Sequence, residues 1–146
     1  MKQLSQKTTL IILGSVLVFL VIAVILLNPG RRLADERNNI RLENLTQIVE
    51  GVTKYASKNN GVLPKGIPVS DNCEDTKNEI CRAGAEGCDK VALSVLVNDK
   101  YMEFMPTDPQ SKDEKGTGYN IVQSDKGRIT LCAPSAELGK KIVYIK

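Results

Sequence analysis

The chain has no histidine and no tryptophan, and only 4% of its 146 residues are aromatic. Without histidine, neither a Ser-His-Asp triad nor a thiol nucleophile activated by histidine can form, and the commonest nitrogen ligand for zinc is missing. Paired carboxylates alone are too common to indicate an enzyme. We therefore expect no catalytic site, no cofactor and no metal centre.

Neither sign of charge predominates in the chain, since the formal net charge is +3 and acidic and basic residues are interspersed. No basic patch is interleaved with aromatic side chains, which is the pattern that indicates binding to nucleic acid. We expect no nucleic acid among the partners.

What is abundant is an uncharged apolar run over residues 10–27. As a helix, this run is long enough to span about 30 Å of hydrocarbon. It predicts a single pass through a lipid membrane. A secretory signal peptide is the alternative, because Lys2 and Lys7 precede the run, but no A-x-A-like cleavage step follows it. The positions expected to form the membrane or assembly surface are Leu10, Leu13, Leu17, Leu20, Val24 and Leu27.

Four cysteines, all beyond the apolar run, lack the paired C-x-x-C spacing of a zinc site. Two disulfides in an oxidising compartment are the favoured interpretation, and four free thiols in a reducing compartment are the alternative. The chain then divides into a hydrophobic helix, residues 1–30, and an extracytoplasmic domain, residues 31–146. The expected location is a membrane, with residues 31–146 outside the cytoplasm. Three connectivities are possible for Cys73, Cys81, Cys88 and Cys132.

Within 31–60, apolar residues recur at steps of three and four, which predicts an amphipathic helix. They are Leu42, Leu45, Val49, Val52 and Ala56. Asn59 to Gly61 and then Pro64 indicate its end. Pro29 predicts a kink or a short break between this helix and the apolar one. The alternatives are one helix from Lys7 to Ser57, or two helices with a joint at residues 28–30.

The remainder is expected to be a disulfide-stapled loop over 61–88 and then a short helix over 90–97 capped by Asp89. Three strands follow, at 119–123, 128–132 and 142–145. An antiparallel β-meander packed on the amphipathic helix would bury both apolar faces. The expected fold class is α+β.

Two sets of acidic residues need an interpretation. Asp108, Ser111, Asp113 and Glu114 could offer oxygens to calcium, but their spacing does not match the ligand spacing of an EF-hand loop, and a solvated loop is favoured. A solvated surface is also the favoured interpretation of Asp71, Glu74, Asp75 and Glu79.

In order and spacing, several strings resemble the type IV pilins and the pseudopilins of type II secretion. The strings lie at residues 27–31, 55–64, 106–109, 117–119 and 128–137. Small bacterial pilins with a disulfide-bonded head are particularly similar. The resemblance implies a filament subunit whose partners are copies of itself, other pilin-like subunits and the envelope assembly machinery.

The chain departs from the pilin pattern at its N-terminus, where precursors carry a glycine before the cleavage point and a glutamate shortly after it. Lys7 stands at the glycine position and Ile12 at the glutamate position, so Lys7 and Thr8 mark a degenerate processing region. Without the glutamate, helix packing alone must supply the energy of assembly. A single-pass anchor that binds or scaffolds without polymerising is the alternative function.

For the cysteines we expect Cys88 to pair with Cys132, which would join the start of the short helix to the sheet. Cys73 would then pair with Cys81 in a small loop.

Overall fold

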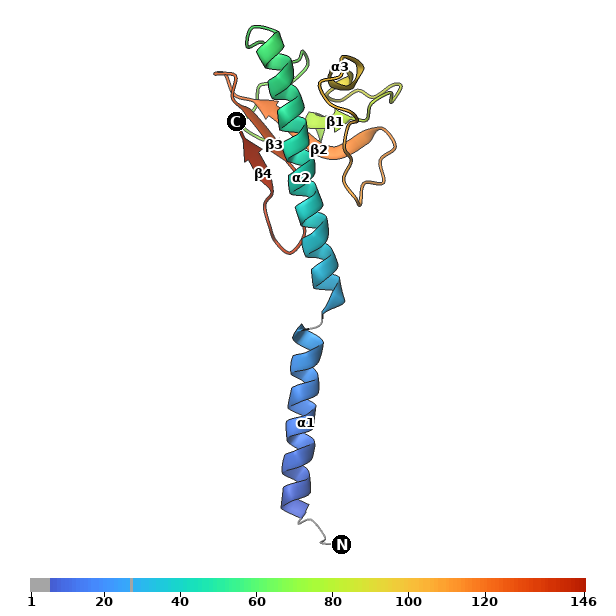
Figure 1. Ribbon diagram of the computed structural model, residues 1–146, viewed down its shortest axis with the longest axis vertical. Helices are drawn as coiled ribbons and strands as arrows, with labels where there is room; N and C mark the ends of the chain where they lie inside the picture. The colour runs from blue at the N-terminus through green and yellow to red at the C-terminus, as the bar shows by residue number, and fades with distance from the viewer. Residues whose placement is uncertain (1–5, 27) are drawn as a thin grey trace. The chain divides into compact units, whose positions relative to one another are not determined.

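The computed structural model describes residues 6–26 and 28–146 and divides the chain into two compact units. The first unit ends at Leu33, and the second comprises Ala34–Lys146. Helix α1, Gln6–Leu26, belongs to the first unit, and helix α2, Pro29–Lys58, begins there and continues into the second (Figure 1).

The start of α2 follows from the local sequence. Asn28 is not helical, and its side-chain Oδ1 accepts a hydrogen bond from the backbone N–H of Arg31 at 3.2 Å. This is an N-cap, and Pro29 occupies the first helical position, where its missing N–H costs nothing. The break predicted at Pro29 is confirmed, and its physical form is the capped start of a second helix.

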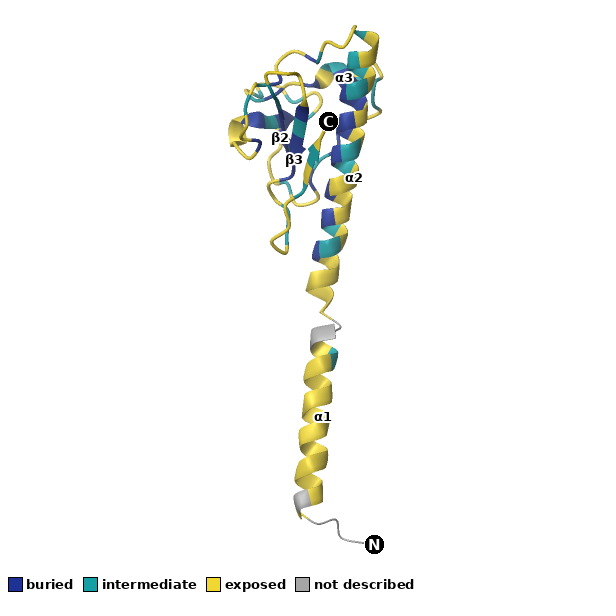
Figure 2. Ribbon diagram, turned by 90° about the vertical axis from the view of Figure 1, so that its left-hand side faces the viewer, coloured by how far each residue is buried: buried dark blue, intermediate teal, exposed yellow. Residues whose placement is uncertain are grey.

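Helix α2 buries one face against the rest of the second unit (Figure 2). Leu45, Val49 and Val52 are buried as the periodicity predicted. Leu42 was expected on the same face, but it is 49% exposed. The buried face continues toward the N-terminus through Arg41 and Asn38 instead, both polar.

A single antiparallel sheet with strand order β1-β2-β3-β4 forms the other layer. Its strands are β1 (Glu79–Cys81), β2 (Gly116–Gln123), β3 (Ile129–Cys132) and β4 (Val143–Ile145). The last three form the predicted meander, so the α+β class is confirmed. The sequence did not predict β1, which pairs with β2 through an irregular register.

The short helix predicted over 90–97 begins later, as α3 (Ser94–Asn98), and its N-cap is Leu93 rather than Asp89. Val91 explains the difference, because its backbone is bonded to β1. Its N–H donates to Glu79 O, and its carbonyl accepts from Cys81 N–H, both at 2.9 Å. These bonds hold Val91 extended, so no helix can start before it. A 3-10 turn, Thr76–Asn78, precedes β1.

The core lies between α2 and the sheet. Ile48 and Val52 from α2 are fully buried in it together with Tyr119 and Ile121 of β2 and Leu131 of β3. A smaller cluster, of Cys73, Val122 and Cys132, lies on the opposite face of β2 and β3. The sheet therefore buries apolar side chains on both faces.

Candidate functional site

The apolar surface of α1 is the main candidate site. Among the described residues, one helix, near the N-terminus, is long and apolar enough to cross a membrane. The expected surface residues Leu10, Leu13, Leu17, Leu20 and Val24 are all more than half exposed. Leu27 and the side chain of Lys7 lie outside the described residues.

This surface can act only through apolar contact. From Thr8 to Leu26 the helix carries no charged residue, and Ile12 is 47% exposed. An exposed helix that is apolar all round is suited to lipid or to the apolar helices of neighbouring molecules. Between Thr8 and Leu26 it offers no carboxylate that could form an ion pair.

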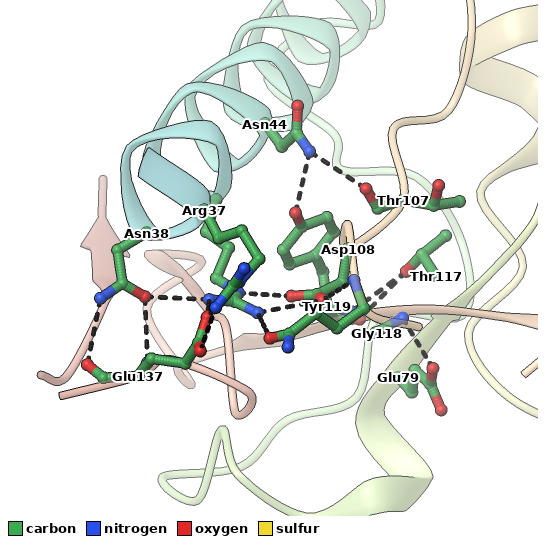
Figure 3. A network of polar contacts seen from close by, with 12 residues as sticks. Arg37, Asn38, Asn44, Glu79, Thr107, Asp108, Thr117, Gly118, Tyr119 and Glu137 are labelled. Carbon is green, nitrogen blue, oxygen red and sulfur yellow. Dashed lines mark hydrogen bonds and ion pairs between the residues drawn. The ribbon is translucent and has the colours of Figure 1, made fainter. Parts of the chain in front are cut away.

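The second feature is a polar cluster in the head, by which we mean the unit Ala34–Lys146 (Figure 3). The centre of the cluster is Arg41, which is fully buried. Its Nε donates to Asp108 Oδ2 at 2.6 Å, and its Nη2 donates to Asp108 Oδ1 at 3.2 Å. Nη2 also donates to Gln110 Oε1 at 2.7 Å. Such two-point pairing is the strongest geometry that a guanidinium makes with a carboxylate.

Glu137 joins a second loop to the same cluster. Its carboxylate accepts from Arg41 Nη1 at 3.0 Å and from Arg37 Nε at 2.6 Å. The backbone of Glu137 makes two hydrogen bonds with the side chain of Asn38. The Glu137 carbonyl accepts from Asn38 Nδ2, and the Glu137 N–H donates to Asn38 Oδ1, both at 3.0 Å. The hydrogen bonds from Arg37 and Arg41 lower the pKa of Glu137 to about 2.

The charge of Arg41 is maintained despite its burial. Burial is the largest single influence and opposes the charge, but the hydrogen bonds of Asp108 and Glu137 outweigh it, and the pKa of Arg41 is raised. A buried ion pair of this kind costs desolvation, and loss of either partner would leave an uncompensated buried charge. Here it fixes the loop containing Asp108 and the loop containing Glu137 against one face of α2.

Tyr119 and Gly118 place β2 beside the same loop. The hydroxyl of Tyr119 accepts from Asn44 Nδ2 at 2.8 Å, and that amide also donates to Thr107 O at 3.2 Å. Burial raises the pKa of Tyr119 to about 12. Gly118 has φ +81, and a Cβ there would lie 2.7 Å from Asp108 Cβ. Only glycine allows this close approach.

The expectation of solvated acidic surfaces holds for Asp71, Glu74, Asp75 and Glu114, which are exposed, and is corrected at Asp108, Asp113 and Glu79. Asp108 is buried and paired, and Asp113 Oδ2 accepts from Lys90 Nζ at 2.9 Å. That bond and the backbone N–H groups of Lys115 and Gly116 lower the pKa of Asp113 to about 2. Glu79 pairs with Lys90 and accepts from Gly118 N–H at 2.8 Å. The carboxylates of Asp108, Asp113 and Glu79 are therefore bonded to groups of this chain.

The expected disulfide pairing is wrong. Cys73 is bonded to Cys132, and Cys81 is bonded to Cys88. Cys73 and Cys132 meet because the segment before β1 crosses one face of the sheet. Asn120, on that face, donates from Nδ2 to Cys73 O at 2.8 Å. The Cys81–Cys88 loop includes a turn in which Ala85 N–H donates to Arg82 O at 3.2 Å.

Sequence reasoning missed the buried Arg41 although a signal was present. Arg41, Leu45, Ile48 and Val52 are spaced by four, three and four residues, which places all of them on one helical face. An arginine on an apolar face requires an acidic partner, and the loops beyond the helix contain several candidates.

Among the residues described, no group of three or more histidine, cysteine or acidic side chains is arranged to hold a metal ion. Comparison of the chain with family models, curated proteins and solved structures found no match. The architecture is nonetheless pilin-like: an apolar N-terminal helix, a second helix packed on an antiparallel sheet, and two disulfides.

Proposed function

We propose that the chain is a structural subunit of a filament resembling a type IV pilus or a type II secretion pseudopilus. The observation that carries the proposal is α1, a helix without charge from Thr8 to Leu26 whose large apolar side chains are exposed over residues 10–24, joined to a disulfide-bonded α+β head. Before assembly, α1 would anchor the chain in the inner membrane with the head outside the cytoplasm. The proposal assigns the protein no catalysis and no cofactor.

Assembly would bury the surface of α1 among α1 helices of other subunits. Each fully buried Leu, Ile, Val or Phe side chain contributes about 1.5–3 kcal/mol relative to an exposed one, although exchange from lipid would yield less. Repeated head-to-tail contacts of one surface with another generate an open helical filament. Because Ile12 replaces the glutamate, packing and not charge would set the position of one subunit along the next.

The second candidate is a membrane-anchored protein that does not polymerise and whose head binds or scaffolds an envelope partner. Lys7 and Ile12 favour it, because they replace the residues on which processing and charge pairing of pilins depend. Both candidates use α1, but only the first requires contacts between α1 helices.

Site-specific photo-cross-linking from α1 distinguishes the two candidates. A photoreactive amino acid at Val18, which is 59% exposed, should give a ladder of cross-linked chains in the sheared surface fraction of native cells. The matched control is Val62 in the head, 61% exposed, where the ladder should be absent. Monomer confined to the membrane fraction, with no ladder from Val18, would exclude the filament.

Charged substitution provides an independent test. Val18→Lys together with Ile22→Lys should abolish incorporation into a filament, because each charge would be buried among apolar helices at a high desolvation cost. Val62→Lys is the matched control and should assemble normally. Unchanged assembly of the Val18→Lys/Ile22→Lys chain would refute packing through α1, and the membrane fraction reports whether that chain still inserts.

Intact-mass spectrometry then defines the processed form. A chain from the sheared fraction that begins near Lys7 or Thr8 would show processing at the degenerate site, whereas a chain that begins at Met1 and is confined to membranes would support the anchor.

A further inference from the structure

The two edges of the head's sheet differ in how their backbone groups are used. At the β1 edge, Val91 occupies the outer side: Cys81 N–H donates to Val91 O, and Val91 N–H donates to Glu79 O, both at 2.9 Å. The chain therefore covers this edge itself. β4 is at the other end of the strand order, and β3 is its only neighbour in that order (Figure 1).

The register of β4 shows which of its backbone groups point away from β3. Ile129 and Lys146 exchange both backbone hydrogen bonds, at 2.8 and 2.9 Å. Hydrogen-bonded pairs alternate along an antiparallel ladder, so Tyr144, opposite Leu131, also bonds inward. Val143 and Ile145 belong to the intervening pairs, which are not hydrogen-bonded to β3. Their N–H and C=O groups therefore point outward, away from β3. In the described part of the chain, these four groups make no hydrogen bond.

The side chains of β4 make the same edge apolar. Val143 is 43% exposed and Ile145 is 59% exposed. Alternation along a strand puts both on one face, the face of Cys132, which is paired with Val143. Tyr144 points to the other face and packs partly buried against the core. An added strand would satisfy the outward backbone groups and cover both exposed side chains.

The charges around this edge are basic. Lys141, Lys146 and Arg128 are exposed, and within the described chain none of them makes an ion pair. Lys140 is paired with Asp35 at 2.7 Å. Two acidic residues lie in the same region: Glu74 lines a small cavity together with Lys140, Lys141 and Val143, and Asp125 is exposed three positions before Arg128.

This charge pattern selects among possible occupants of the edge. Two copies of β4 paired with each other would bring lysines together, and like charges opposite one another destabilise a strand pair. Lysines beside an edge strand also discourage unspecific pairing between sheets. An extended segment with acidic residues at its ends would instead gain favourable charge contacts at both ends of β4.

We propose that β4 is a docking edge that binds an extended acidic segment of a partner protein by strand addition. In this mode, main-chain hydrogen bonds supply affinity and the flanking charges supply specificity. The proposal goes beyond the filament function and does not rest on it, because an anchored head that never polymerises would have the same edge.

Residue-resolved amide hydrogen exchange of the full-length chain in detergent micelles tests the proposal. The probe is a blocked seven-residue peptide of alternating valine and threonine with glutamate at both ends. At millimolar peptide, exchange at Val143 and Ile145 should slow by about fivefold or more, because their outward N–H groups become bonded. Exchange at Tyr144, already bonded to β3, should not change.

Three comparisons make the test specific. Ile145→Pro removes an outward N–H without removing a bond to β3, so it should abolish the protection at Val143, whereas Ile145→Ala should retain it. A peptide methylated on the amide nitrogens that would face β4 should not bind. A peptide with lysine in place of the glutamates should bind at least about tenfold more weakly, and Lys141→Glu with Lys146→Glu should reverse that preference.

The results that would overturn the proposal are equally definite. Equal binding of the glutamate and lysine peptides would eliminate the acidic partner, and binding that survives both Ile145→Pro and the methylated peptide would eliminate strand addition. Protection of Val143 and Ile145 that rises with protein concentration in the absence of peptide would show that a second copy occupies the edge. No protection at any peptide concentration would leave β4 as a solvated edge.

Discussion

Replacement of Arg41 by methionine should be the most damaging single change in the polar cluster of the head. Arg41 and Asp108 are both buried, and Arg41 donates two hydrogen bonds to that carboxylate. Arg41→Met preserves much of the apolar volume but leaves Asp108 as a buried charge without its cation. Removal of one partner from such a pair costs about 3–5 kcal/mol.

The expected shift in melting temperature follows from the size of the head. Unfolding entropy near the transition is about 2.1 cal/mol/K per residue, or roughly 0.24 kcal/mol/K for the unit Ala34–Lys146. A loss of about 3–5 kcal/mol therefore corresponds to a decrease of about 12–20 °C. All four tyrosines lie in this unit, so near-ultraviolet tyrosine circular dichroism of the full chain in detergent reports its unfolding alone.

The matched control is Lys54→Met, on the same helix and in the same unit. Lys54 is exposed, and within the described residues it makes no ion pair, so its replacement should change stability by less than about 0.5 kcal/mol. Asp108→Asn combined with Arg41→Met should cost less than the sum of the two single changes, because the double variant has no buried unpaired carboxylate. A loss below about 1 kcal/mol for Arg41→Met, with additive effects in the double variant, would refute the reasoning.

Two further predictions concern acid and the disulfides. Since the folded pKa of Glu137 is about 2, below its ordinary value of about 4.3, its contribution to stability is present above that ordinary value and is lost as the pH falls toward 2. Urea titrations at several pH values should show a weaker acid dependence for Glu137→Gln than for wild type, whereas Glu43→Gln, at an exposed position, should leave the dependence unchanged; equal dependence in all three would contradict the assignment. The Cys73–Cys132 disulfide joins residues 59 positions apart, and the Cys81–Cys88 disulfide joins residues seven positions apart. Loop-closure entropy then predicts that removal of the first costs about 4 kcal/mol and removal of the second about 2 kcal/mol, measured by urea unfolding of the paired serine variants; a larger loss for the shorter loop would contradict this account.

Elements with strong local signals were predictable from the sequence. The apolar run gave α1, the period of three and four gave α2, and Pro29 gave the break between them. The three strands of the meander were found because each is bounded by turn residues. These signals depend on residues that are close in the sequence, so they can be recognised without knowledge of the fold.

The disulfide pairing depended on contacts that are distant in the sequence. Cys73 meets Cys132 because the segment before β1 lies across the sheet, and nothing near either cysteine specifies that path. Strand β1 and the start of helix α3 also depend on contacts between residues that are distant in the sequence. Val91 is held extended by bonds to β1, and this tertiary contact overrides the helical pattern that begins at Lys90.

By itself, the sequence determined an apolar helix, an amphipathic helix, a β-meander and an oxidised head, because periodicity, turn chemistry and composition are local properties. Only the tertiary structure decided which acidic residues are paired, which cysteines meet and which sheet edge is open. Arg41 and Asp108 are 67 residues apart, and their ion pair forms only when two loops close on one face of α2. The outward groups of Val143 and Ile145 likewise depend on the register between β3 and β4, which no single strand encodes.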